Sequence, residues 1–135
     1  MSAASRAPVA PAHPLVLSTD PDLLDDLLRL LAAAGATAEL ATGGGALRRA
    51  HRDAPLVLLG AEVLGGAPVR ALPRRPGVLV VATGEPAPEV WPAAVELGAE
   101  RVVALPRDEA WLVERVAAAV QAPARPGWLT VVGGA

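Results

Sequence analysis

The sequence contains no cysteine, no phenylalanine and no tyrosine, and all of its 12 Lys+Arg residues are arginine. Without cysteine the chain has no disulfide and no thiolate ligand for a metal, and cysteine usage leaves the redox compartment undecided. Isoleucine and asparagine are missing as well. The missing residue types other than cysteine have A/T-rich codons, which indicates a G/C-rich bacterial genome.

Long apolar runs and an excess of positive charge are also lacking. No run approaches the roughly 20 apolar residues of a membrane-spanning helix, so we expect no direct membrane insertion. The net charge of −2 argues against a protein dominated by a nucleic-acid surface. Residues 1–13 lack the continuous apolar segment of a signal peptide, and we interpret them as a flexible N-terminal lead. The chain is therefore expected in the cytoplasm.

Strand-like and helix-like runs alternate along the rest of the chain. The strand-like runs are 14–18, 37–42, 55–60, 77–83 and 101–106, and the helix-like runs are 20–34, 45–53, 90–98 and 108–120. Segment 61–76 is interrupted by glycine and proline, so any helix there is short or distorted. The alternation predicts an α/β fold, a doubly wound, five-stranded parallel sheet in a three-layer sandwich of the flavodoxin-like type.

The same pattern predicts the domain boundaries. Residues 14–120 form one domain, and 121–127 are a proline-rich linker. Residues 128–135, "WLTVVGGA", begin a further apolar strand that ends in glycines. A single strand does not complete a domain, so we expect this sequence to be the N-terminal part of a longer protein.

Ligands of doubly wound sheets gather at the carboxyl ends of the strands. The residues expected there are Ser18, Thr19, Asp20, Gly60, Thr83, Leu105 and Pro106. The segments "STDPDLLDDLLRLLAAAG", "DAPLVLLG", "VVATGE" and "AAVELGAERVVALPRDE" occur in an order that resembles a response-regulator receiver domain over roughly 14–120.

The receiver resemblance implies a pocket that has lost its chemistry. Receivers hold Mg²⁺ with an acidic pair after the first strand, and this pair falls on Ser18 and Thr19. The aspartate nucleophile falls on Gly60 and the lysine on Leu105, whereas the hydroxyl position keeps Thr83. The resemblance therefore implies no catalytic residue, no metal and no cofactor. Receivers also carry a cis bond at the proline that corresponds to Pro106.

Two acidic residues lie near this pocket in the sequence. Asp20 precedes Pro21, which fits a helix N-cap followed by proline at the first helical position. Glu62 is close enough to swing toward the pocket, but a single carboxylate is a poor Mg²⁺ site.

Two arginine clusters are interpreted as solvated faces, with contact to an acidic partner as the alternative. They comprise Arg48, Arg49 and Arg52, together with His51, and Arg70, Arg74 and Arg75. No aromatic residues alternate with these arginines, as stacking on single-stranded nucleic acid would require, so no nucleic-acid partner is expected. The preceding "TGGGALRR" lacks the GxGxxG spacing of a phosphate-binding loop. His13 and His51 are far apart and indicate no metal site.

The tryptophans indicate a candidate interface. Trp111 lies beside the apolar stripe of helix 108–120, and Trp91 opens helix 90–98. Packing within the monomer and a partner surface both remain open for Trp111. We expect protein partners, or a homodimer formed through the last two helices, with Trp111, Trp91 and Arg115 as the candidate interface residues.

The tail adds a second resemblance. "WLTVVGGA" after a receiver-like domain and a proline-rich linker resembles the first strand of a ParA/MinD-type ATPase. This arrangement is similar to the TadZ/CpaE pilus-localisation proteins and to septum-site-determining proteins. It implies a non-catalytic domain that localises or regulates its own C-terminal ATPase domain at the septum or the cell pole. The alternative is an atypical receiver module of another signalling or transcription regulator. A nucleotide-binding flavodoxin-like protein is disfavoured because residues 14–120 lack a phosphate-binding loop.

Overall fold

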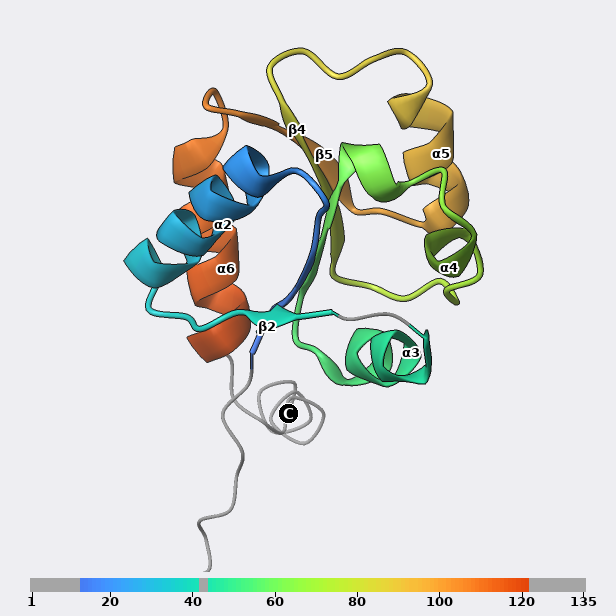
Figure 1. Ribbon diagram of the computed structural model, residues 1–135. Coiled ribbons are helices and arrows are strands. Elements are labelled where there is room, and N and C mark those ends of the chain that lie inside the picture. The colour runs from blue at the N-terminus through green and yellow to red at the C-terminus, as the bar shows by residue number, and fades with distance from the viewer. Residues whose placement is uncertain (1–12, 42–43, 122–135) are drawn as a thin grey trace, which may run out of the picture.

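The computed structural model describes residues 13–41 and 44–121 (Figure 1). Five parallel strands form one sheet in the order β2-β1-β3-β4-β5. Their bounds are β1 Leu15–Leu17, β2 Glu39–Leu40, β3 Val57–Gly60, β4 Val78–Thr83 and β5 Arg101–Leu105. The α/β fold with a five-stranded parallel sheet, predicted from the alternating runs, is confirmed.

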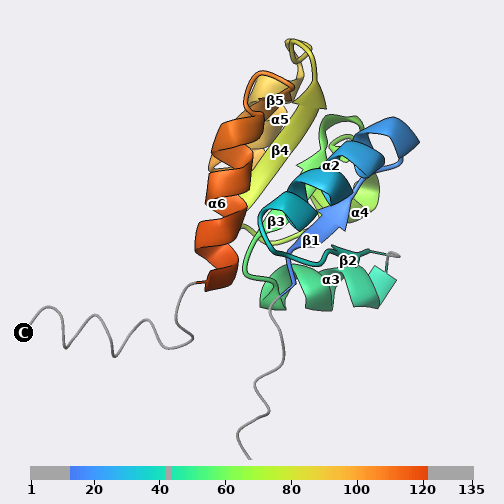
Figure 2. The same cartoon turned by 90° about the vertical axis from the view of Figure 1, so that its left-hand side faces the viewer.

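Helices cover both faces of this sheet (Figures 1 and 2). Helices α2 (Pro21–Ala33) and α6 (Glu109–Gln121) pack on one face, where their leucines and valines meet Val16, Leu58, Leu79 and Val81 of the sheet. Helices α3 (Gly44–Asp53), α4 (Ala67–Arg70) and α5 (Val90–Leu97) lie on the other face, against Leu15, Val57, Leu59, Val78 and Val80. Successive strand residues therefore enter two separate cores, which explains why β3 and β4 are continuously apolar.

The ends of two helices follow their sequence signals. Asp20 is the N-cap of α2 and Pro21 its first residue, as predicted. Helix α5 ends before Gly98, which has a left-handed backbone with φ of 83°. Glycine adopts this conformation without the steric cost that a Cβ would add.

The segment between β3 and β4 is the irregular part of the fold. It contains a 3₁₀ turn, η1 (Ala61–Val63), and the single helical turn of α4. The prediction that any helix here is short is confirmed, because glycine and proline interrupt the run on both sides of α4.

Several sequence predictions lie outside the described residues. These are most of the N-terminal lead at 1–13, the linker at 121–127 apart from Gln121, which belongs to α6, and the strand at 128–135. Across the described part of the chain, no helix has the length and apolar character needed to cross a bilayer.

Candidate functional site

The carboxyl ends of β1, β3, β4 and β5 meet at one edge of the sheet, because all the strands are parallel. A shallow cavity of about 330 Å³ lies there, lined by residues that include Asp20, Glu62 and Thr83. Thr83 is exposed at the end of β4. Of the predicted pocket residues, Asp20 and Thr83 line this cavity, together with Glu62.

Glu62 is the residue that joins the two sides of this pocket. One of its carboxylate oxygens, Oε2, accepts a hydrogen bond of 2.5 Å from the Ser18 hydroxyl and one of 2.7 Å from the Thr19 amide. Glu62 belongs to the 3₁₀ turn that follows β3, whereas Ser18 and Thr19 follow β1. The two polar residues that the receiver resemblance assigns to the position of the acidic pair thus donate hydrogen bonds to a carboxylate.

Asp20 uses its carboxylate to cap α2. Its Oδ1 accepts from the amides of Asp22 at 3.0 Å and Leu23 at 3.4 Å. The interpretation of Asp20 as an N-cap is therefore confirmed, and this oxygen satisfies two backbone donors that the first helical turn leaves without partners.

Gly60 and Leu105 are the residues that the receiver resemblance assigns to the positions of the nucleophile and the lysine. Gly60 ends β3 without a side chain. The Leu105 side chain is buried at 2% exposure in the core under α2 and α6. The Leu105–Pro106 peptide bond is cis, as in receivers.

The charged residues around the cavity are acidic. Asp20, Glu62, Glu85 and Glu89 line it together with apolar and hydroxyl side chains. Within the described residues, no three His, Cys, Asp or Glu side chains form a group that could hold a metal ion. Among the described residues that line the cavity, none carries a cationic side chain.

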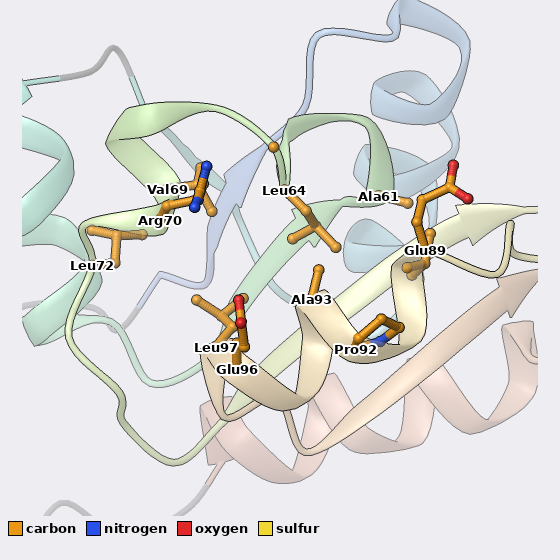
Figure 3. A pocket seen from close by; sticks show the side chains of 12 residues that line it. Ala61, Leu64, Val69, Arg70, Leu72, Glu89, Pro92, Ala93, Glu96 and Leu97 are labelled. Atoms are coloured by element: carbon orange, nitrogen blue, oxygen red, sulfur yellow. The ribbon is translucent and has the colours of Figure 1, made fainter.

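A second hollow, of about 520 Å³, lies between α4 and α5 (Figure 3). Leu64, Val69 and Leu97 line it as buried apolar residues, with Arg70 on the α4 side and Glu89 and Glu96 on α5. Sequence reasoning did not identify this groove. The interrupted segment 61–76 is the sequence feature that could have indicated the groove. A single helical turn fills less space beside α5 than a longer helix would.

The flank formed by α5, β5 and α6 carries the predicted interface residues. Trp91 and Val95 lie one turn apart on α5 and are 46% and 72% exposed. Trp111 is half-buried against the core, and the Arg101 guanidinium lies 4.4 Å from the centroid of its ring. Trp111 therefore packs partly within the monomer, and Trp91 is the more exposed tryptophan of the two.

Arg115, the third candidate interface residue, is held by an ion pair. Its guanidinium donates two hydrogen bonds to the Glu100 carboxylate, at 2.7 and 2.9 Å. These bonds hold the pKa of Glu100 below its ordinary value. The pair fixes α6 to the start of β5, next to the Arg101–Trp111 stack.

The two arginine clusters are not uniform solvated faces. Arg74 donates to the carbonyls of Val95 and Glu96 at the end of α5, at 3.1 and 2.8 Å. Arg75 donates to the carbonyls of His51 and Ala54 at the end of α3, both at 2.6 Å. These two arginines cap helix C-termini, where positive charge is favourable.

The interpretation of His51 as part of an exposed basic face is wrong. Its side chain is 1% exposed, and its Nε2 is 2.9 Å from the Pro73 carbonyl. Arg48, Arg49 and Arg52 of the same helix are exposed. The loop 73–76, "PRRP", covers His51 and thereby removes it from solvent.

A family model described as "Rv3660c-like, CheY-like N-terminal domain" matches residues 17–127. The chain is also 33% identical over 121 residues to two proteins of Mycobacterium tuberculosis, the uncharacterized proteins Rv3660c and MT3760. These alignments cover 86% of this chain and 35% of the relatives, so the chain spans about a third of their length.

Solved structures share the fold. A CheY-like response regulator from Mesorhizobium loti matches with a TM-score of 0.58 at 22% identity, over 82% of this chain and 99% of that one. A CheY-like protein, TadZ, from Pseudomonas aeruginosa matches with a TM-score of 0.58 at 24% identity, over 78% and 93% of the two chains. A protein from Burkholderia thailandensis described as a pilus assembly protein, CpaE, has a TM-score of 0.53 at 21% identity, over 79% and 98%. At these identities the likeness shows the fold alone.

Proposed function

The chain belongs to the family of Rv3660c-like, CheY-like N-terminal domains, and we propose that it is a non-catalytic receiver-like domain that acts through protein contacts. The observation that carries this proposal is the state of the pocket. Gly60 has no side chain that could accept a phosphoryl group, and the Ser18 hydroxyl and the Thr19 amide already bind the Glu62 carboxylate.

The charges at the pocket support the same proposal. Transfer of a phosphoryl group to a receiver needs Mg²⁺ and a fixed cation to offset the charge of the phosphate. Here the cavity lining is acidic, and Leu105 places an apolar side chain at the position of the lysine. A second anion at this place would be repelled by Asp20 and Glu62 without a compensating positive group.

The surface that we assign to partner binding is the flank of α5, β5 and α6. Trp91 and Val95 expose apolar area there. The Arg101–Trp111 stack and the Arg115–Glu100 pair provide a fixed polar border. Exposed aromatic residues with an adjacent arginine are typical of residues that dominate the energy of protein interfaces.

The partner that we propose is a MinD/ParA-like ATPase domain of the longer protein, which this domain localises or regulates. Two observations support it. The curated relatives are about three times as long as the part that this chain matches. The fold is shared with TadZ and with a CpaE described as a pilus assembly protein. This role is compatible with the positioning of a pilus or secretion system. It is equally compatible with septum-site determination.

The test of the pocket is phosphoryl uptake. We expect no mass increase when the chain is incubated with acetyl phosphate and Mg²⁺, and no Mg²⁺-dependent shift of pocket resonances with beryllofluoride. A CheY-like receiver that retains its aspartate serves as the positive control. A stoichiometric phosphoryl adduct, or saturable Mg²⁺ binding near Asp20, would contradict the proposal.

The test of the surface is association. We expect the chain to form a homodimer or to bind its ATPase domain without any phosphoryl donor, measured by analytical ultracentrifugation and titration calorimetry. Trp91→Ala and Trp111→Ala should each weaken this association about tenfold or more, because central aromatics contribute about 2 kcal/mol. Glu96→Gln is the matched control, since Glu96 lies on α5 but lines the groove toward α4. Equal weakening by Glu96→Gln would assign binding to the groove instead.

A further inference from the structure

We infer that Glu62 is an internal ligand of the degenerate pocket, and that residue 60 is glycine because the Glu62 carboxylate occupies the place of its side chain. This inference rests on the proposed function, in which the pocket is that of a receiver-like domain without phosphoryl transfer. It names the group that holds the site in one state without phosphorylation.

The backbone of Gly60 does not itself require glycine. Its φ of −63° and ψ of 143° lie in the extended region that every L-residue adopts. Glycine is therefore not required here for a left-handed turn, unlike Gly98 with its φ of 83°. A side chain at this position is therefore limited by neighbouring atoms and not by the backbone conformation.

The Glu62 carboxylate occupies the space in which a side chain of residue 60 would lie. A Cβ built on Gly60 would lie 2.6 Å from Glu62 Oε2 and 2.8 Å from Glu62 Cδ, and closer still to Oε1. The three nearest atoms outside the neighbouring residues thus all belong to the Glu62 carboxylate group. The 3₁₀ turn Ala61–Val63 begins directly after the strand and folds the Glu62 side chain back over residue 60. The Glu62 carboxylate thus lies beside the end of β3, where a receiver carries its nucleophilic aspartate.

In this position the Glu62 carboxylate accepts two hydrogen bonds. Its Oε2 accepts from the Ser18 hydroxyl and from the Thr19 amide, at 2.5 and 2.7 Å. Both donors belong to the β1–α2 loop, which is the loop that carries the acidic pair in receivers. One side chain therefore links the end of β3 to the β1–α2 loop. The two segments that a receiver joins through Mg²⁺ are joined here by a hydrogen-bonded carboxylate.

The experiment is a double-mutant cycle on the 135-residue chain, with the Thr19 amide as its reporter. The amide proton resonance of Thr19 and its exchange rate with solvent are measured by NMR in the wild type, Glu62→Ala, Gly60→Ala and the double variant. We expect an upfield shift and faster exchange in Glu62→Ala, because the amide loses its acceptor. Gly60→Ala should produce the same change, because the methyl group displaces the carboxylate.

The double variant separates this inference from general destabilisation. In the Glu62→Ala background, Gly60→Ala should leave the Thr19 amide unchanged, since no carboxylate remains to be displaced. Glu89→Ala is the matched control, because Glu89 lines the same cavity without a bond to the loop. Glu62→Gln should change the Thr19 amide resonance less than Glu62→Ala does, because the glutamine side-chain oxygen can still accept its hydrogen bond.

Two results would overturn the inference. One is a Thr19 amide that does not respond to Glu62→Ala. The other is a Gly60→Ala effect that is equally large with and without Glu62. Neither readout depends on partner binding or on phosphoryl uptake, so the inference and the proposed function can fail separately.

Discussion

At the scale of single residues, His51 presents the clearest conflict between chemistry and environment. The Pro73 carbonyl is an acceptor only, so Nε2 of His51 carries a proton and donates to it over 2.9 Å. Nδ1 is then the unprotonated nitrogen, and it is buried with no hydrogen-bond partner among the described residues. Protonation would place an unsatisfied N–H and a positive charge inside the protein, beside the Arg75 guanidinium.

The stability of the domain should therefore depend on the charge of His51. Burial is the main cause that lowers the pKa of His51, and the Arg75 charge lowers it further. The unfolded chain, with an imidazole pKa of about 6.5, then binds a proton that the folded chain does not. The free energy of unfolding should be constant above that pH and fall as the pH decreases from about 6.5 toward the lowered pKa. Urea unfolding between pH 8 and 5 measures this slope.

The matched variant for this measurement is His51→Gln. A glutamine can keep a donor near the Pro73 carbonyl but does not titrate, so the component of the slope near pH 6 should disappear. A wild-type slope that persists in His51→Gln would assign the pH dependence to carboxyl groups instead.

The sequence separation between a residue and its contacts decides whether its role could be predicted. Asp20 could be predicted as a cap because its partners, Asp22 and Leu23, lie within three residues. His51 could not, because its burial depends on Pro73 and on Arg75, more than twenty residues later. Glu62 was recognised as close to the pocket, but its bonds to Ser18 and Thr19 depend on how two distant strand ends meet.

At the scale of elements, helix α5 shows how a local signal and a distant residue combine at one helix end. The helix ends before Gly98, which has a left-handed backbone. Arg74 then donates to the carbonyls of Val95 and Glu96 in the last turn, and the Val95 carbonyl also accepts from the Gly98 amide at 3.0 Å. The guanidinium also lies against Gly98, since a Cβ there would be 3.2 Å from Arg74 Cζ.

Arg74→Ala should destabilise the domain through this helix end. The loss should be about 1 kcal/mol, because the arginine makes charge-assisted bonds at an exposed helix terminus. Arg70→Ala is the control, since Arg70 is an exposed arginine of the same segment that makes no hydrogen bond or ion pair within the described part of the chain. Thermal unfolding of both variants compares them. Equal effects of the two substitutions would mean that the helix-end bonds contribute nothing specific.

At the scale of the whole molecule, the sequence predicted the sheet better than its surface. Runs such as "PLVLLG" and "GVLVVAT" are apolar throughout because each strand contributes to two cores, one on each face of the sheet. This pattern is independent of the details of any contact, and so it indicated the topology. The groove between α4 and α5 and the burial of His51 under loop 73–76 depend on how irregular segments pack, which periodicity does not encode.

The distribution of positive charge over the molecule is the property that bears on nucleic acid. Arg74 and Arg75 are engaged with helix carbonyls, and Arg52 is paired with Asp53 at 2.9 Å. The arginines left on the face of α3 are Arg48 and Arg49, on a chain with a net charge of −2. Affinity for duplex DNA depends on several simultaneous phosphate contacts, each of which adds to the salt dependence of binding.

We therefore expect no specific or tight binding of duplex DNA. Fluorescence anisotropy of a labelled duplex should show at most weak binding at low salt, and none near physiological salt. The variant Arg48→Glu/Arg49→Glu/Arg52→Glu should behave as the wild type at physiological salt. Arg107→Glu controls for charge reversal at an exposed arginine outside the α3 face, one that is paired with Asp108. Tight binding with a steep salt dependence, lost in the triple variant and kept in Arg107→Glu, would instead make the α3 face a DNA-binding surface. The proposal that this domain acts through protein contacts alone would then be wrong.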